Sequence, residues 1–275
     1  MIFTHKLWEM LCTELQRNGI HSIPACEVAA DTGSYLVLKH DVETEVRKAY
    51  QIACIESRLG HRGSYYVQAY LLKNEKNVRM LRKIQEMGHE VSYHYDVMDS
   101  CKGNLTQAIS EFEENRNLFE KHGFPVRTVC QHGNPVVTRV GYASNRDFFR
   151  SEKVRALYPG MKDIMVNFQQ DVPTEYRYFS DAGRRFHLIY DPVNNDLVCS
   201  DDKNILVDTL EKLLEYIRTE SCIVSIHPHR WTKSGAQYLI RTAIFKTVKK
   251  IAKILIKIPI FKKIMSRYYH LAKKI

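Results

Sequence analysis

Short apolar runs alternate with amphipathic stretches along the first 230 or so residues, and this alternation predicts strands and helices. Apolar residues spaced three and four apart are typical of helices that cover one side of a core. The apolar runs are short and bounded by turn residues, which is typical of buried strands. The pattern predicts helices at 4–17, 43–59, 75–86, 105–121 and 204–218 and strands beginning at 36 and spanning 64–69, 89–95, 126–130, 163–168, 186–190 and 222–226.

Repeated strand–helix units of this length predict a parallel sheet with right-handed crossovers. Their span suits one α/β domain built as a closed or nearly closed (β/α) barrel. We therefore expect a barrel domain over residues 1–231 and a separate helical tail over 232–275. In such a barrel the chemistry lies at the carboxyl ends of the strands.

The strand that begins at Leu36 ends in a group of titratable side chains, Lys39-His40-Asp41-Val42-Glu43. Because side chains alternate along a strand, Asp41 and Glu43 are expected on one face and His40 on the other. Two carboxylates at a strand end indicate either a functional site or a cap for the next helix.

Three other predicted strands also end in polar residues. His94 and Asp96 follow the third strand and share a face through their spacing of two. The fourth and last strands lead into Gln131-His132-Gly133-Asn134-Pro135 and His227-Pro228-His229-Arg230-Trp231. A single histidine is more often a packed residue than a ligand, but the convergence of four such strand ends predicts an active site.

The amino-acid composition indicates the size of the core and the cellular compartment in which the protein is expected. With 44% hydrophobic residues, the 275-residue chain can bury a large core. Seven scattered cysteines without a Cys-x-x-Cys pair favour neither a disulfide framework nor a zinc knuckle, so we expect a reducing compartment. Residues 1–19 include Glu9 and Glu14 and are unlike a signal peptide, which favours a cytoplasmic protein.

The net charge of +10 is concentrated in the tail. Residues 232–275 hold twelve Lys or Arg and no Asp or Glu, which leaves 29 basic against 31 acidic residues before them. The body has no basic stripe, so no nucleic-acid partner is expected unless the tail alone binds one.

The tail has the pattern of a basic amphipathic helix, with Pro259 expected to break or kink it. It lacks an uncharged run near the roughly 20 residues that cross a bilayer. We therefore expect it to lie in the interface of an anionic membrane, on the cytoplasmic face. The alternative is a helix packed on its own barrel or on a partner. The basic residues expected at the membrane include Lys249, Lys250, Lys253, Lys257, Lys262 and Lys263.

Three motifs carry a resemblance to a known family. Lys39-His40-Asp41-Val42-Glu43, Gly88-His89-Glu90-Val91-Ser92-Tyr93-His94 and His227-Pro228 resemble motifs of the NodB-like polysaccharide deacetylases, or carbohydrate esterase family 4. The best match is the divergent branch that has His-Asp-Val-Asp in place of the usual Asp-Asp pair. The resemblance implies a distorted (β/α) barrel of the NodB type, a divalent metal, commonly zinc, and hydrolysis of an N-acetyl or less often O-acetyl group on a sugar.

The resemblance also implies residue roles. Asp41 matches the catalytic base, and His227 matches the histidine that acts as general acid. Glu43 takes the place of the second, metal-binding carboxylate, and His94 matches the first metal histidine. Tyr93, Asn134, His229 and Trp231 are candidate sugar contacts, with ordinary packing as the alternative for each.

Two family positions are changed. The second carboxylate is displaced by one residue and lengthened to Glu43. Four residues after His94, where the family usually has a second metal histidine, this chain has Met98. A thioether is a poor ligand for a hard hydrolytic metal, so another residue must supply the third ligand or the metal is lost. We expect His132 to supply it, with Asp96 as the second choice.

These observations favour a hydrolase that acts on the C–N bond of an N-acetylated sugar or glycan, in cell-surface polysaccharide or glycolipid biosynthesis. A metal with an open position lowers the pKa of water to about 7, Asp41 would take the proton, and His227 would protonate the departing amine. Expected partners are a glycan, nucleotide-linked or lipid-linked sugar and an anionic membrane. Two alternatives stay open: a non-catalytic glycan-binding barrel, and a membrane or nucleic-acid adaptor that acts through the tail.

Overall fold

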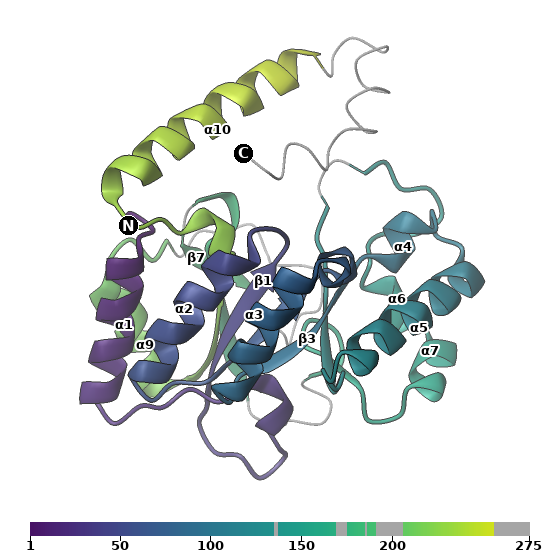
Figure 1. Ribbon diagram of the computed structural model, residues 1–275, viewed down its shortest axis with the longest axis horizontal. Helices are drawn as coiled ribbons and strands as arrows, with labels where there is room; N and C mark the ends of the chain where they lie inside the picture. The colour runs from purple at the N-terminus through teal and green to yellow at the C-terminus, as the bar shows by residue number, and fades with distance from the viewer. Residues whose placement is uncertain (135–136, 169–174, 185, 191–205, 256–275) are drawn as a thin grey trace.

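The computed structural model describes residues 1–134, 137–168, 175–184, 186–190 and 206–255 (Figure 1). A single sheet of eight strands in the order β5-β4-β3-β2-β1-β8-β6-β7 forms its centre. All neighbouring strands are parallel except the antiparallel pair β6 and β7. The strands are β1 Leu36–Val42, β2 Gly63–Val67, β3 Glu90–Tyr95, β4 Thr128–Gln131, β5 Lys162–Asp163, β6 Tyr176–Ser180, β7 His187–Tyr190 and β8 Ser221–Ile226.

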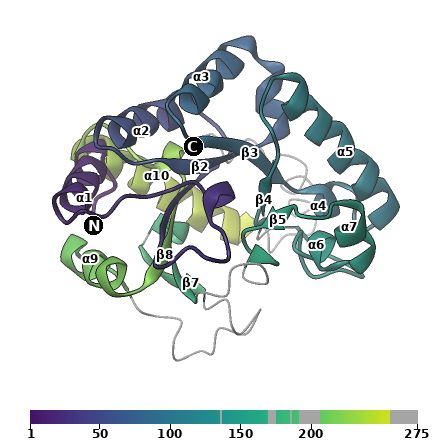
Figure 2. The same ribbon diagram turned by 90° about the horizontal axis from the view of Figure 1, so that it is seen from below.

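The sheet curls, and helices cover its outer face (Figure 2). Among the described residues no pairing joins the edge strands β5 and β7, so the barrel is open there. This is the mixed α/β barrel class that the strand–helix alternation predicts, in the distorted form that the family resemblance implies. The helices are α1 His5–Arg17, α2 Val46–Arg58, α3 Glu75–Glu86, α4 Val97–Ser100, α5 Leu105–Lys121, α6 Asp147–Arg150, α7 Glu152–Leu157, α9 Leu210–Thr219 and α10 Gly235–Leu255, with short 3-10 turns η1 Ala25–Glu27, η2 Ala69–Lys73, η3 Ala182–Arg184 and η6 Pro228–Arg230.

Local sequence accounts for several element boundaries. The side chains of Thr4, Asn74 and Asn104 accept hydrogen bonds from backbone N–H groups in the first turns of α1, α3 and α5, which satisfies donors that a helix start leaves free. Gly63 lies opposite Leu38 on β1, where a Cβ atom would come within 2.5 Å of the Leu38 carbonyl oxygen. Only glycine lets β2 approach β1 this closely.

Two predicted elements differ from the structure. The strand expected over 163–168 ends at Asp163, because its carboxylate accepts a hydrogen bond from the Met165 N–H at 2.7 Å and its carbonyl accepts one from Val166 at 3.1 Å, which turns the chain. The last helix begins at Leu210 rather than at 204 and is capped by Thr209. The start of its predicted range, 204–205, lies outside the described residues. The pattern did not predict β6.

The core has an outer and an inner part. On the outside, aromatic residues such as Phe112 and Phe119 pack between the sheet and α5, and α2 and α3 extend this layer. On the inside, Tyr66, Tyr178 and Ile223 fill the concave face of the sheet. Because the inside is filled by side chains, the space available for chemistry lies at the strand ends.

The end of the barrel body and the start of α10 are joined to the N-terminal segment. Thr232 and Thr4 form a parallel bridge, and the His5 N–H donates to the Thr232 carbonyl at 2.9 Å. From there α10 extends over the carboxyl end of the sheet (Figure 1). Among the described helices, none has the length and apolarity that crossing a membrane requires.

Candidate active site and metal centre

Five of the residues expected from the strand ends meet in one place. Asp41 lies on β1, Glu43 just after it, His94 on β3, His132 after β4 and His227 after β8. Asp41 and Glu43 are 7% and 8% exposed, and His94 and His132 are both 2% exposed. His227 is half-buried and lies at the mouth of the group. Parallel pairing of β1 with β2 and β8, and of β3 with β4, brings these strand ends to one edge of the sheet.

Glu43, His94 and His132 form a group that could hold a metal ion. One ligand atom from each lies within 4.8 Å of the others, and His132 Nε2 is 3.2 Å from Glu43 Oε1. His94 Nδ1 is 3.0 Å from the carbonyl oxygen of Cys130, which can only accept, so Nδ1 carries the proton and Nε2 keeps its lone pair. Burial lowers the pKa of His94 to about 3, which keeps the ring neutral. Two imidazoles and a carboxylate fit a divalent metal such as zinc.

A second possible group, Asp41 with His94 and Cys130, fits a metal less well. A cysteine binds metal as the thiolate. Burial raises the pKa of the Cys130 thiol well above its ordinary value, and the thiol donates to the Gln131 carbonyl oxygen at 3.5 Å. We therefore favour the group that contains Glu43 and His132, and Asp41 stays available as a base.

Asp41 is paired with a buried lysine on its own strand. Lys39 Nζ is 2.5 Å from Asp41 Oδ1, and the ammonium lies over the rings of Tyr66 and Tyr178 at 5.6 and 5.8 Å. Burial alone would raise the pKa of Asp41, but the charge of Lys39 and the neighbouring His94 and His227 outweigh it and lower that pKa to about 2. Asp41 is therefore ionised over the physiological range.

His227 is held by a buried carboxylate on the neighbouring strand segment. Asp181 follows β6, and its Oδ1 accepts from His227 Nδ1 at 2.6 Å. Arg230 and the Trp231 indole N–H also donate to Asp181, at 3.2 and 2.9 Å. Burial would raise the pKa of Asp181, but His227 and Arg230 lower it strongly, so the carboxylate is charged. The Nε2 atom of His227 points to the opposite side, 3.8 Å from Asp41 Oδ2 and 3.8 Å from Glu43 Oε1.

The structure brings His132, rather than Asp96, to the predicted metal position. Asp96 lies 4.0 Å from His132 Nδ1 with 42% of its side chain exposed, and it is not part of the group formed with Glu43 and His94. Met98 is 4% exposed and packs in the outer core, so it does not replace a ligand.

Two of the candidate sugar contacts are buried side chains, in line with the packing alternative for these positions. Tyr93 is 1% exposed, packs against Phe112 and accepts a hydrogen bond from Asn115 on α5, because on β3 it faces away from its neighbour His94. Trp231 is 2% exposed and stacks on Phe3 at 5.1 Å, with its indole N–H directed at Asp181. Both side chains belong to the interior.

The other two predicted sugar contacts remain near the site as predictions. The ring of His229 lies edge-on to His227 at 5.8 Å. Asn134 is half-buried in the loop after β4, where its carbonyl accepts a hydrogen bond from Arg139 at 2.8 Å. Of the lysines expected at the membrane, Lys249, Lys250 and Lys253 lie on α10, and Lys257, Lys262 and Lys263 lie outside the described residues.

Sequence reasoning missed two residues of the site, Lys39 and Asp181. Lys39 stands in the motif that led to Asp41, and its spacing of two places it on the same strand face. Asp181 directly follows Tyr176-Arg177-Tyr178-Phe179-Ser180, an aromatic-rich run that is typical of a strand. The rule that found the other residues, a polar group after a strand, would have found Asp181 as well.

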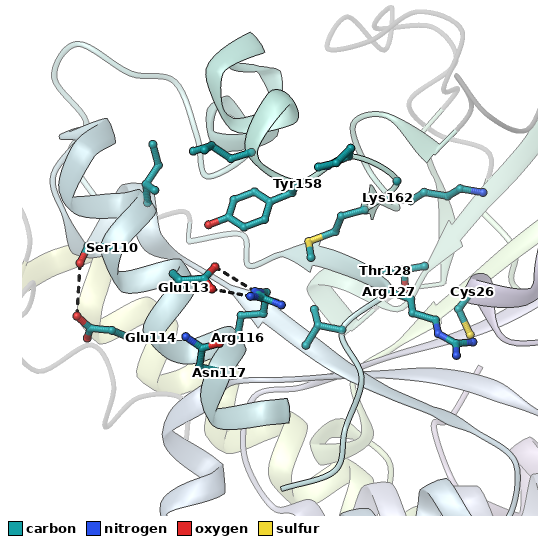
Figure 3. Close-up of a pocket in the computed structure, with 16 residues that line it drawn as sticks. Cys26, Ser110, Glu113, Glu114, Arg116, Asn117, Arg127, Thr128, Tyr158 and Lys162 are labelled. Carbon is teal, nitrogen blue, oxygen red and sulfur yellow. Dashed lines mark hydrogen bonds and ion pairs between the residues drawn. The ribbon is translucent and has the colours of Figure 1, made fainter. Parts of the chain in front are cut away.

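A hollow of about 1060 Å3 lies at the end of the sheet opposite the candidate active site (Figure 3). Thr128 and Lys162, which begin β4 and β5, line one side of it, and α5 lines the other. The ion pair between Glu113 and Arg116 lies in its wall. It contains none of the predicted catalytic or metal-binding residues, so its size does not mark it as the reaction centre.

No family model and no curated protein matches the sequence. Among solved structures, the chain is similar to a family 4 carbohydrate esterase from Streptomyces lividans in complex with acetate, with 13% identity over 71% of this chain and 80% of that chain and a TM-score of 0.42. It is also similar to a CE4 esterase from Streptococcus mutans, with 13% identity over 85% and 91% and a TM-score of 0.43. A third is a peptidoglycan deacetylase from Bacillus subtilis, with 10% identity over 79% and 96% and a TM-score of 0.38. At these identities, the reaction has to be derived from this chain's own residues.

Proposed function

We propose that this protein is a metal-dependent deacetylase that hydrolyses an N-acetyl group on a sugar or glycan. The observation that carries the proposal is the placement of Asp41 and His227 around the Glu43–His94–His132 group, with Nε2 of His227 3.8 Å from both carboxylates. These separations are too long for direct hydrogen bonds. Nε2 of His227 is therefore close to both carboxylates without a direct hydrogen bond to either.

The chain's own residues would divide the work. A divalent metal, proposed to be zinc, would polarise the acetyl carbonyl and activate a water when held by Glu43, His94 and His132. Asp41, kept ionised by Lys39, would accept the proton of the attacking water. His227 would donate a proton from Nε2 to the departing amine, while Asp181 fixes its tautomer through Nδ1 and stabilises the imidazolium.

The setting proposed for the reaction is the cytoplasm, during assembly of a cell-surface polysaccharide or glycolipid. The described cysteines Cys12, Cys26, Cys54, Cys101, Cys130 and Cys222 are free thiols, which supports a reducing compartment. The substrate classes that follow are N-acetylated nucleotide sugars and lipid-linked glycans.

The test combines elemental analysis with acetate release from a panel of both substrate classes. We expect stoichiometric metal in the purified protein and acetate release that falls by about 100-fold to 10,000-fold in Asp41→Asn. Asn keeps the shape of the side chain but cannot take the proton, so circular dichroism and metal content should change little.

The matched control is Asp31→Asn, the same change at an exposed residue, which should release acetate at the wild-type rate. Full activity in Asp41→Asn would contradict the assigned base. Glycan binding without metal and without acetate release would identify a non-catalytic binding barrel instead.

A further inference from the structure

Helix α10 carries apolar side chains that the rest of the described protein does not cover. Leu239, Ile240 and Ile244 are 59%, 60% and 45% exposed. Their spacing of one, four and five residues places them on one side of the helix. Exposing three large aliphatic side chains to water on consecutive turns is unfavourable. This side of the helix is therefore suited to contact with a membrane or with another protein.

The opposite side of α10 is already used to hold the helix on the barrel. Tyr238 is 6% exposed and packs edge-on against Phe3 at 5.6 Å, and the Arg184 guanidinium lies 4.6 Å from the centre of the Phe245 ring. Arg241 pairs with Glu45 at 3.3 Å. These contacts fix which side of α10 faces the barrel and leave Leu239, Ile240 and Ile244 directed away from it.

The basic residues of α10 and of the following segment favour an anionic binding partner for this helix. Residues 235–255 contain five Lys or Arg and no Asp or Glu, and residues 256–275 contain six more basic residues and no acidic ones. Lys246 and Lys250 are exposed two and six residues beyond Ile244 on the same helix. Basic residues beside an apolar stripe are the arrangement that binds headgroups while aliphatic side chains enter the acyl boundary.

We propose that α10 docks in the plane of an anionic membrane surface, with Leu239, Ile240 and Ile244 inserted and the lysines among the headgroups. Arg241 also lies 3.4 Å from the carbonyl oxygen of His229, in the loop that carries His227. Docking would therefore hold the loop that carries His227 beneath α10, about one helix diameter, or about 10 Å, from the lipid surface. This orientation would favour a lipid-linked glycan as substrate, a step that rests on the proposed deacetylase function.

The docking is tested by flotation of the full-length protein with two kinds of vesicle, neutral phosphatidylcholine alone and a mixture with phosphatidylserine. We expect binding to the anionic vesicles that falls as salt is raised, and weak binding to the neutral ones. The double variant Ile240→Glu/Ile244→Glu should reduce the bound fraction by more than about tenfold. Both positions are exposed, so the fold should be unaffected.

Matched controls separate the helix from general changes in charge or polarity. Val140→Glu/Leu157→Glu introduces the same charges at apolar residues that are 82% and 52% exposed elsewhere, which should lower binding far less. Lys246→Gln/Lys250→Gln should weaken binding more than Lys73→Gln/Lys76→Gln, which removes the same charge from exposed residues in η2 and α3.

Two results would overturn the proposal. One is equal binding of the wild type and Ile240→Glu/Ile244→Glu to anionic vesicles. The other is a wild-type dimer, measured by light scattering, that the same double variant converts to a monomer, because a second copy would then cover the apolar side. Flotation needs no catalysis, so an inactive protein that still docks would overturn only the proposed reaction.

Discussion

Strand β1 separates two buried clusters of carboxylates and histidines. The two clusters contain the same types of side chain but have different roles. On its outer side, Glu56 lies 2.9 Å from His40 and is fully buried. On its inner side, Asp41 and Glu43 face His94, His132 and His227. Both clusters follow from one short motif, since alternate side chains of β1 point to opposite faces.

The clusters differ in how fully their oxygens are satisfied. Glu56 accepts hydrogen bonds from the Trp8 indole at 2.9 Å and the Tyr65 hydroxyl at 2.7 Å, with His40 and His89 close by. In the inner cluster Asp41 is fixed on one side by Lys39, while its distances to His94 and His227 are 3.9 and 3.8 Å. A carboxylate saturated with short donors is a structural element. One that lies at the open strand ends with long separations can bind and react.

The largest contrast should be in metal binding. His132→Ala removes a proposed ligand of the inner cluster, and Met98→Ala removes a core side chain that does not reach it. Loss of a residue that merely orients a ligand lowers affinity by about 10-fold to 100-fold, so loss of the ligand itself should cost at least about 100-fold. Zinc affinity is measured by competition with a chelator.

Met98→Ala should instead lower the free energy of unfolding by about 2 to 5 kcal/mol with little change in zinc affinity. Asp96→Ala, which changes an acidic neighbour of His132, is the second control. Equal zinc binding by His132→Ala and the wild type would remove His132 from the site and return Asp96 to consideration.

The outer cluster should respond in stability rather than activity. Glu56→Gln keeps the side-chain size but turns one acceptor into an amide N–H2 that faces a donor from Trp8 or Tyr65. We expect the free energy of unfolding to fall by about 2 kcal/mol, measured by urea titration. Acetate release per folded molecule should stay at the wild-type value. Glu86→Gln, at an exposed position on α3, is the matched control, and a Glu56→Gln protein that is folded but inactive would erase the distinction between the two clusters.

A smaller effect should appear in the pH profile of acetate release when Lys39, the cation of the inner cluster, is replaced. The pKa of Asp41 is about 2 because Lys39, together with His94 and His227, outweighs the effect of burial, so the base is charged throughout the usual assay range. In Lys39→Met burial acts without that charge, and the pKa of Asp41 should rise by about one unit or more. The fraction of ionised base then falls as the pH is lowered.

The expected result is a loss of activity at acidic pH that begins about one pH unit or more above the pH at which the wild type loses activity, with activity at pH 7 largely kept. Methionine is close to lysine in size and suits the rings of Tyr66 and Tyr178, so the fold should tolerate it. Lys76→Met, at the surface of α3, should leave the profile unchanged. An unaltered profile in Lys39→Met would mean that the metal alone keeps Asp41 ionised.

Much of this arrangement could be predicted because it depends on local stereochemistry. Alternation along β1 places Asp41 and Glu43 together and His40 behind them, as the structure has it. The same alternation applied to β3 would have excluded Tyr93 from the site, since its neighbour His94 faces inward. Helix boundaries at 75–86 and 105–121 follow from the spacing of apolar residues and from their caps.

What only the tertiary structure decided is which distant segments become neighbours. Asp181 reaches His227 because β6 pairs with β8, an association of residues 46 positions apart. The choice of His132 over Asp96 depends on the path of the chain after β4, and the burial of Trp231 depends on Phe3 from the other end of the domain. Periodicity fixes the side of an element on which a residue stands. Which element it meets is fixed by the packing of the whole chain, to which no single stretch of sequence gives access.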